Sequence, residues 1–291
     1  MCAIRSTLTF VLHGIFDAPT HVWHLPVDSF AQLWRHLEPS LSGADASRRV
    51  FLTFDDGLVG SYDSFMRIAG DSGVRATWFV VSDRVGSSEK FIGWSGLRKL
   101  LADGHAIGSH SKTHRSLFNL SDSALRSELK ESKARMEDEL GVPCPQFAAP
   151  FGHVDRRIVD VARESGHEEI YSTVPGWDMF RTPYRRRTTI SQSTTVHEIV
   201  ELLANPAEER HRQHIAVVFD DNVSKANLET IAAADHVVCC SDAALRLCAQ
   251  YAIPAVVINA DRSSKLDDLT EAAGAALSLP TAQIVVHRIE Q

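Results

Sequence analysis

The most informative segment of the sequence is Val50-Phe51-Leu52-Thr53-Phe54-Asp55-Asp56-Gly57, a mostly apolar run that ends in two adjacent carboxylates and a glycine. Such a run predicts a buried strand, and the loops that follow buried strands build the sites of parallel α/β folds. Neighbouring residues at a strand end point in different directions. One carboxylate can therefore bind a metal ion while the other faces a water or a substrate. An Asp-Gly turn after a core strand is the alternative interpretation.

A second segment, Gly104-His105-Ala106-Ile107-Gly108-Ser109-His110-Ser111-Lys112-Thr113-His114, places two histidines four residues apart. On a helical turn, His110 and His114 would face the same way. Two imidazoles and one carboxylate, with positions left for water, are typical of a catalytic rather than a structural zinc-type site. The pair alone is a weak signal, because two surface histidines at this spacing are common.

A third segment, Phe147-Ala148-Ala149-Pro150-Phe151-Gly152, follows these two. In this order, the three motifs resemble those of the polysaccharide deacetylases, the NodB-like carbohydrate esterases. The resemblance covers residues 8–205, approximately. It implies a distorted (β/α) barrel with fewer than eight regular units, and an activity that removes the acetyl group from an N-acetylated amino sugar.

The resemblance also implies roles for individual side chains. Asp56, His110 and His114 would bind a divalent ion, and zinc, cobalt and nickel all suit this ligand set. Asp55 would be the general base that takes a proton from the attacking water, with an N-cap of the following segment as the alternative. The main chain of Pro150-Phe151-Gly152 would help to hold the oxyanion. Phe in place of the family's Tyr should matter little there, since the donor is an N–H of the backbone.

The residue that orients the base is less evident. Ala148 stands where many family members carry an arginine, a departure shared by the subgroup that reads Phe-Ala-x-Pro-Tyr-Gly. Arg185, Arg186 and Arg187 are the candidates to replace it. The alternative for three adjacent arginines is solvated surface charge.

The general acid departs from the common pattern too. Many members place a His-Asp pair on the last strand of the barrel, but Val217-Val218-Phe219-Asp220-Asp221 holds no histidine. In the circularly permuted subgroup the acid follows an N-terminal strand, which indicates His13 in Leu12-His13-Gly14. A strand-end histidine bonded to the backbone is the alternative.

Further residues are candidates for substrate contacts. His105 and His153 are polar candidates. Trp94, Trp177 and Phe151 are candidate apolar walls, although tryptophans are more often simply buried.

Strand-like and helix-like segments alternate up to about residue 173 and predict an α/β fold with a parallel sheet. The expected strands are 8–12, 50–54, 76–81, 147–149 and 169–173. The expected helices are 28–37, 61–73, 94–103, 121–140 and 156–165, and a further helix containing Asn205-Pro206 follows them.

The last part of the chain reads as a second, smaller α/β unit. We expect a first domain at 1–210 and a second at 211–291, the latter resembling half of a Rossmann-type domain. Its expected strands are 215–219, 236–240, 255–258 and 284–286, with helices at 225–234, 242–251 and 265–276.

One segment of this second unit, 234–256, is similar to the C-terminal half of GT-B glycosyltransferases and related nucleotide-sugar hydrolases. It has no glycine-rich phosphate loop, so anion binding would fall to the helix start at Ser241-Asp242. A packing or homo-oligomerisation unit without chemistry is the alternative.

The composition of the chain bears on its partners and on its compartment. A net charge of −7 without a basic block argues against nucleic acid or an anionic membrane surface as a partner. No segment approaches the roughly 18 apolar residues of a membrane span, and the N-terminal apolar run is too short for a signal sequence. Five cysteines without disulfide or zinc spacing suit the cytoplasm.

We therefore expect a cytoplasmic, metal-dependent N-deacetylase that acts on a small or lipid-linked sugar intermediate. A deformylase or a cyclic-amide hydrolase on the same barrel is the alternative within this chemistry. From other classes, the alternatives are a non-catalytic carbohydrate-binding protein, and a C-terminal unit that binds a nucleotide-sugar on which the barrel acts.

Overall fold

The structure, a computed structural model, describes residues 6–42, 48–152, 154–178 and 184–204, together with four strands between residues 213 and 289. The chain divides into two compact units. The first comprises Met1–Gly152 with Val159–Pro206, and the second comprises His153–Ile158 with Ala207–Gln291.

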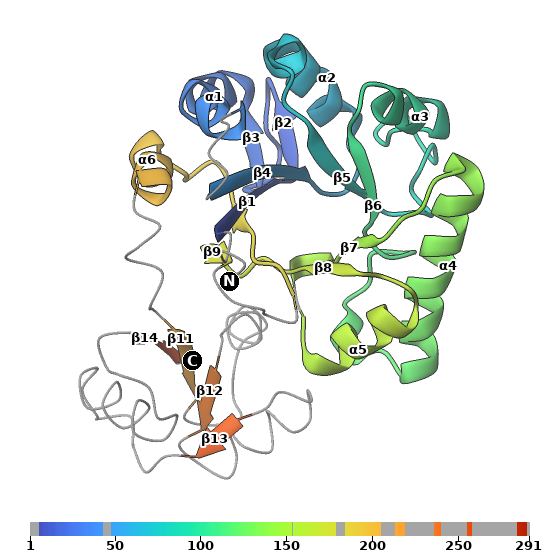
Figure 1. Ribbon diagram of the computed structural model, residues 1–291, viewed down its shortest axis with the longest axis vertical. Helices are drawn as coiled ribbons and strands as arrows, with labels where there is room; N and C mark the ends of the chain where they lie inside the picture. Colours follow the sequence, from blue (N-terminus) through green and yellow to red (C-terminus); the bar gives the residue numbers. More distant parts are fainter. Residues whose placement is uncertain are drawn as a thin grey trace, which may run out of the picture. The chain divides into compact units, whose positions relative to one another are not determined.

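The first unit is built on an eight-stranded sheet in the order β10-β1-β4-β5-β6-β7-β8, with β9 paired to β1 (Figure 1). Its pairs are parallel except that of β1 with β9. The strands are β1 (Ser6–Leu12), β4 (Arg48–Phe54), β5 (Ala76–Val80), β6 (Ala106–Ser109), β7 (Gln146–Ala148), β8 (Glu169–Tyr171), β9 (Trp177–Asp178) and β10 (Thr188–Thr189).

The sheet curls, and one segment links its two ends. The N–H of Arg185 donates to the carbonyl of Ile170 in β8, and Arg185 pairs with Tyr171. A few residues later, the N–H of Ile190 donates to the carbonyl of Val11 in β1 over 2.9 Å. Residues 185–190 therefore bring the last strand of the series back to the first.

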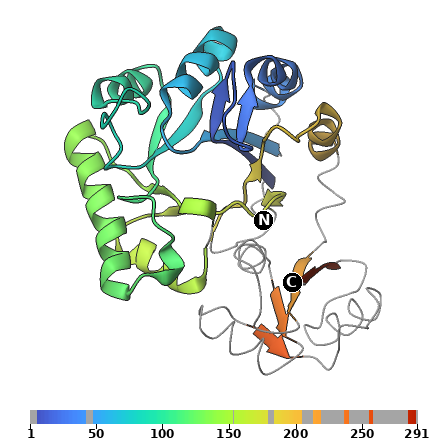
Figure 2. The same ribbon diagram turned by 180° about the vertical axis from the view of Figure 1, so that it is seen from behind.

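Helices lie on the outside of the curled sheet, as Figures 1 and 2 show for α1 to α4. The helices of the first unit are α1 (Val27–Ser42), α2 (Val59–Ala69), α3 (Trp94–Ala102), α4 (Asp122–Leu140) and α6 (Val196–Ala204), while α5 (Arg156–Glu164) spans the division between the units. Helix α4 has the ends that its sequence predicts. The Ser121 hydroxyl accepts from the N–H of Ala124, and Gly141 closes the helix in a left-handed conformation.

The core between sheet and helices is rich in aromatic rings. Phe54 of β4 stacks on Trp78 of β5 with ring centroids 4.2 Å apart, and Phe65 of α2 meets both rings edge-on. Burial of each such side chain stabilises the fold by about 2–3 kcal/mol. This packing fixes the β4 strand whose end carries the two carboxylates.

The expected strands and helices of the first unit are confirmed, with ends shifted by a few residues. The structure adds short elements that the sequence did not indicate: β2 (Gly14–Phe16), β3 (His24–Pro26), β9 and β10. Two or three residues are too few to show a strand's alternation. A helix is present where one containing Asn205-Pro206 is expected, with α6 described up to Ala204, but Asn205-Pro206 itself lies outside the described residues.

In the second unit, four parallel strands pair in the order β13-β12-β11-β14. They are β11 (Gln213–Val218), β12 (His236–Cys239), β13 (Ala255–Val257) and β14 (Ile284–Ile289), close to the four expected strands. The expected helices, and the Ser241-Asp242 helix start, lie outside the described residues. The Rossmann-type and GT-B-like character of this unit therefore stays a prediction. Among the described helices, none is long and apolar enough to cross a membrane.

Candidate active site

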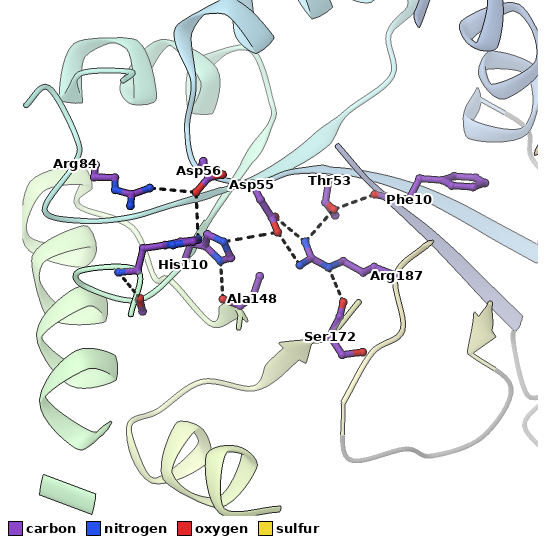
Figure 3. Close-up of polar contacts among 11 residues, drawn as sticks. Phe10, Thr53, Asp55, Asp56, Arg84, His110, Ala148, Ser172 and Arg187 are labelled. Carbon is purple, nitrogen blue, oxygen red and sulfur yellow. Dashed lines mark hydrogen bonds and ion pairs between the residues drawn. The ribbon is translucent and has the colours of Figure 1, made fainter. Parts of the chain in front are cut away.

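The ends of three strands, β1, β4 and β6, bring the predicted residues together on one edge of the curled sheet. His13 follows β1, and Asp55 and Asp56 follow β4, which pairs directly with β1. His110 follows β6. Because the carboxyl ends of parallel strands meet at one edge of a sheet, these residues lie at the same edge, and Figure 3 shows the side chains of Asp55, Asp56 and His110 close together there.

Asp55 lies at the buried end of the site, where it forms an ion pair with Arg187. Its side chain is 2% exposed, and that of Arg187 is fully buried. Nη1 and Nη2 of Arg187 donate to the two carboxylate oxygens over 2.7 and 2.8 Å (Figure 3). The same guanidinium donates to the hydroxyl of Thr53 and to the carbonyl of Ser172. Both groups of the pair are thus held in one geometry.

The electrostatics of Asp55 follow from this pairing. Burial alone would raise the pKa of Asp55, but the charge of Arg187, with that of His110 and the hydrogen bonds from Arg187, lowers the pKa to about 2. Asp55 is consequently a carboxylate throughout the neutral range.

The three predicted arginines have separate surroundings. Arg187 lies on Asp55, whereas Arg185 is half exposed and 3.8 Å from Glu169. Arg186 is buried and donates to the carbonyl of Pro175. Only Arg187 therefore has the position that the base-orienting role requires.

Asp56 turns away from this buried end. Its φ of 68° lies in the left-handed region, and Gly57 follows with a φ of 70°. A Cβ at Gly57 would come within 2.9 Å of Val80 Cγ1, so only glycine fits there. The reversed backbone points the Asp56 carboxylate at the Nε2 of His114, 3.3 Å away.

Asp56, His110 and His114 form a cluster whose potential ligand atoms all lie within 4.8 Å of one another. The Nδ1 of His110 is 2.8 Å from the carbonyl of Ala148, a contact in which Nδ1–H donates, so Nε2 is the nitrogen that can bind a metal ion. Burial, with the nearby His110, lowers the pKa of His114 to about 4, so His114 is neutral at pH 7. Neutral imidazoles and a carboxylate are the protonation states in which these groups bind a divalent ion. The donor set therefore fits a metal ion.

The expected helical turn through His110 and His114 is wrong. Residues 110–116 form an irregular loop in which Ser111 and His114 have φ values of 64° and 63°. Glu128 of α4 holds this loop, since its carboxylate accepts from the N–H groups of Lys112 and Thr113 over 3.0 and 2.9 Å. A hydrogen-bonded loop, and not helical spacing, brings the two imidazoles together.

The third motif forms a tight turn after β7. Phe151 and Gly152 have φ values of 63° and 72°, and a Cβ at Gly152 would overlap Thr173 Oγ1 at 1.8 Å. The Phe151 ring is 45% exposed and 4.8 Å from that of His114. Pro150 has no N–H, and the N–H of Gly152 donates to the carbonyl of Ala149. The predicted oxyanion donor is therefore neither of these two residues.

His13, the predicted general acid, is next to Asp55 across the β1–β4 pair. Its Nδ1 is buried and has no hydrogen-bond partner among the described residues. Burial lowers the pKa of His13, while the carboxylates of Asp55 and Asp56 act in the opposite direction. The ring is thus neutral at pH 7. The alternative of a histidine bonded to the backbone through Nδ1 does not hold.

Other predicted contacts lie away from this centre or in the core. His105 is buried, and its Nδ1 accepts from the N–H of Ala76, which is a structural arrangement. Trp177 is buried, with its Nε1 donating to the carbonyl of Leu202, so it forms no wall of the site. The Trp94 ring is covered by the guanidinium of Arg135, 5.7 Å away. His153 lies outside the described residues. An N-cap role for Asp55 is wrong, because α2 begins after Leu58.

The comparisons with known proteins concern this part of the chain. The family model of polysaccharide deacetylases matches residues 42–170. A gellan lyase of Bacillus sp is 32% identical over 126 residues, which are 43% of this chain and 5% of that protein. The peptidoglycan-N-acetylglucosamine deacetylase of Bacillus cereus is 25% identical over 122 residues, 42% of this chain and 54% of that protein.

The solved structure of Streptococcus pyogenes deacetylase PplD in complex with acetate has the same fold. It aligns with a TM-score of 0.59 and 17% identity over 68% of this chain and 97% of that chain. The matched segments make up about half or less of the two curated relatives. The family model and the homologues together support a polysaccharide deacetylase domain in the first unit.

Proposed function

We propose that this protein is a metal-dependent hydrolase that removes the acetyl group from an N-acetylated amino sugar. The proposal is based on the polysaccharide deacetylase domain of the first unit. One observation carries the proposal: the two adjacent carboxylates are split between two tasks. Asp55 is clamped by Arg187 and aimed into the site, while Asp56 faces two imidazoles. A base and a metal-binding group side by side are what hydrolysis of an unactivated amide requires.

In this proposal, Asp56, His110 and His114 hold the divalent ion, with zinc, cobalt and nickel as candidates. When bound, the ion supplies Lewis-acid polarisation of the acetamide carbonyl and activation of water. The Nδ1 hydrogen bond from His110 to the Ala148 carbonyl keeps the His110 ring in its binding orientation.

The chain's own residues then handle the protons. Asp55 accepts the proton of the attacking water, and Arg187 keeps the carboxylate at a fixed angle during that step. A pKa of about 2 makes Asp55 a weak base, but one that is never lost to protonation at neutral pH. The main chain at Phe151 is the candidate to hold the oxyanion.

His13 is the proposed donor to the departing amine. It must first gain a proton, since burial keeps its ring neutral at rest. The adjacent Asp55 is the group from which that proton can come, because Asp55 has just received one from water. A transfer from Asp55 to His13 to the amine closes the proton balance of the reaction.

Acetate release in the presence and absence of metal tests the proposal. Protein stripped with a chelator should release no acetate from an N-acetylglucosamine oligomer, and stoichiometric zinc, cobalt or nickel should restore release. An equal rate in stripped and reloaded protein would contradict the metal dependence.

An N-formyl oligomer and a cyclic amide, assayed in parallel, separate the alternatives within this chemistry. Preference for either over the acetylated sugar would replace the deacetylase assignment. Saccharide binding without hydrolysis of any of these compounds, in metal-loaded protein, would show a carbohydrate-binding protein.

A further inference from the structure

An exposed tryptophan stands beside the proposed acid. The Trp23 side chain is 46% exposed, and its ring centroid is 6.1 Å from that of His13 at an interplanar angle of 37°. The preceding Val22 is 65% exposed. Large apolar side chains in water are ordinary when they are scattered, but they indicate a binding surface when they border a reactive centre.

The segment that presents Trp23 is held in place. Gln192 donates its main-chain N–H to the carbonyl of Val22 over 3.4 Å and its side-chain amide to the carbonyl of His21 over 3.1 Å. His24 closes a turn by donating its N–H to the same His21 carbonyl over 2.9 Å. A ring fixed before binding loses little conformational freedom when it meets a ligand.

The order of the strands places Trp23 relative to the reaction. Around the curled sheet, His13 follows β1, the two carboxylates follow β4, His110 and His114 follow β6, and Phe151 follows β7. Trp23 directly precedes the short strand β3, and its ring lies beside that of His13 at the β1 end of this series. Trp23 and the 45% exposed Phe151 therefore lie on different sides of the carboxylates, each ring next to a different histidine. An acetamide bound at the centre would have an aromatic ring toward each side.

We propose that Trp23 is a stacking platform for a second sugar ring of the substrate, adjacent to the ring that is deacetylated. The proposal rests on the proposed function and narrows its substrate to a saccharide of at least two units. A pyranose ring presents C–H groups on one face, and a flat aromatic ring beside a polar centre is the surface on which such a face packs. A single amino sugar held at the centre would leave the exposed face of Trp23 unused.

Hydrolysis of N-acetylglucosamine oligomers of increasing length by metal-loaded protein tests the platform. For the wild type, kcat/KM should rise from the monosaccharide to the tetrasaccharide. Trp23→Ala should lose roughly tenfold on the tetrasaccharide and much less on the monosaccharide. Trp23→Phe should retain most of the gain with chain length, because it keeps an aromatic face.

Phe51→Ala is the matched control, since Phe51 is a similarly exposed aromatic residue within β4. It should leave the dependence on length unchanged. Equal losses for both substrates in Trp23→Ala, or no loss at all, would overturn the proposal.

Binding measured without turnover separates this proposal from the deacetylase activity itself. Calorimetric titration of the tetrasaccharide should show weaker binding to Trp23→Ala than to wild type, whether or not acetate is released. If the wild type binds the tetrasaccharide but releases no acetate, the proposed function fails and the platform stands. If Trp23→Ala binds the tetrasaccharide as tightly as wild type, the platform fails, whatever the activity.

Discussion

Asp55 and Asp56 are neighbours in the chain but belong to two differently built halves of the site. The buried half consists of Asp55, Arg187, Thr53 and Ser172, and it is closed by hydrogen bonds among charged and polar groups away from water. The loop half consists of Asp56, His110 and His114, in which Asp56 and His114 are partly exposed and Asp56 is shared with Arg84.

This difference shows how one dipeptide can serve two tasks. In the buried half, strong ion-pair geometry fixes a base and keeps it ionised. In the loop half, the left-handed backbone at Asp56 and His114 positions these two side chains as candidate ligands of a divalent cation. We expect substitutions in the buried half to act mainly on folding stability, and those in the loop half to act mainly on metal affinity.

The largest effect should come from removing the arginine of the buried half. Arg187→Met would leave the carboxylate of Asp55 buried and unpaired, so the free energy of unfolding should fall by about 3–5 kcal/mol. Urea unfolding measures this loss. The double variant Asp55→Asn with Arg187→Met should recover part of it, because the buried charge is gone.

Arg185→Met is the control for this variant. Arg185 is half exposed and 3.8 Å from Glu169, so its replacement should change stability by about 1 kcal/mol or less. Equal losses for Arg185→Met and Arg187→Met would show that the Asp55–Arg187 pair has no special weight.

A smaller effect on stability, with a defined pH dependence, is expected at Asp178. Its carboxylate accepts from the N–H of Arg186 and the hydroxyl of Thr7, and burial raises its pKa from 3.8 to about 6. Because the folded state binds this proton more tightly, the stability that it contributes is present below pH 4 and is lost as the pH rises through 6. At pH 7, Asp178→Asn should therefore be more stable than wild type by on the order of 2 kcal/mol.

Urea unfolding at pH 4, 5, 6 and 7 measures this difference. The advantage of Asp178→Asn over wild type should grow across that range, since Asn keeps an acceptor for the Arg186 N–H. A constant difference would mean that Asp178 does not titrate in this window.

In the loop half, the first expected effect is on metal affinity. Glu128→Gln would weaken the hydrogen bonds to the N–H groups of Lys112 and Thr113, which hold the loop that carries the two histidines. Zinc affinity should fall about tenfold, measured by competition with a chromophoric chelator.

Glu131→Gln is a close control on the same helix. Glu131 is half exposed and accepts from the Nζ of Lys112 and the hydroxyl of Ser127, not from the main chain of the histidine loop. Its replacement should leave zinc affinity unchanged. A loss in both variants would mean that the stability of α4, and not the hold on the loop, sets the affinity.

The smallest effect should come from Arg84, whose Nη1 is 3.4 Å from Asp56 Oδ1. Arg84→Met removes a cation that competes for Asp56, so zinc affinity should rise by roughly threefold at low salt. The gain should shrink at high salt, because Arg84 is partly exposed and its charge is screened. An affinity that falls would show that Arg84 supports the site.

The sequence predicted those parts of the site that depend on local pattern. Val50–Phe54 reads as a strand from its apolar run, and the sheet delivers Asp55 and Asp56 to its edge as expected. The cluster of Asp56, His110 and His114 also forms where the motifs place it.

Contacts between distant parts of the chain could not be predicted in the same way. Arg187 is 132 residues from Asp55, and only the closure of the curled sheet by residues 185–190 selects it over Arg185 and Arg186. The hold of Glu128 on the histidine loop depends on how α4 packs beside that loop. Trp23 lies between two short strands, β2 and β3, whose length is below what periodicity can reveal.

The most direct test of the account compares Asp55→Asn with Asp56→Asn, measuring bound zinc and acetate release from an N-acetylglucosamine oligomer in the same preparations. The division of the dipeptide predicts that Asp55→Asn keeps one zinc ion per chain and releases no acetate, whereas Asp56→Asn loses the zinc. Loss of zinc from Asp55→Asn with retention in Asp56→Asn, or acetate release by both variants at the wild-type rate, would contradict it.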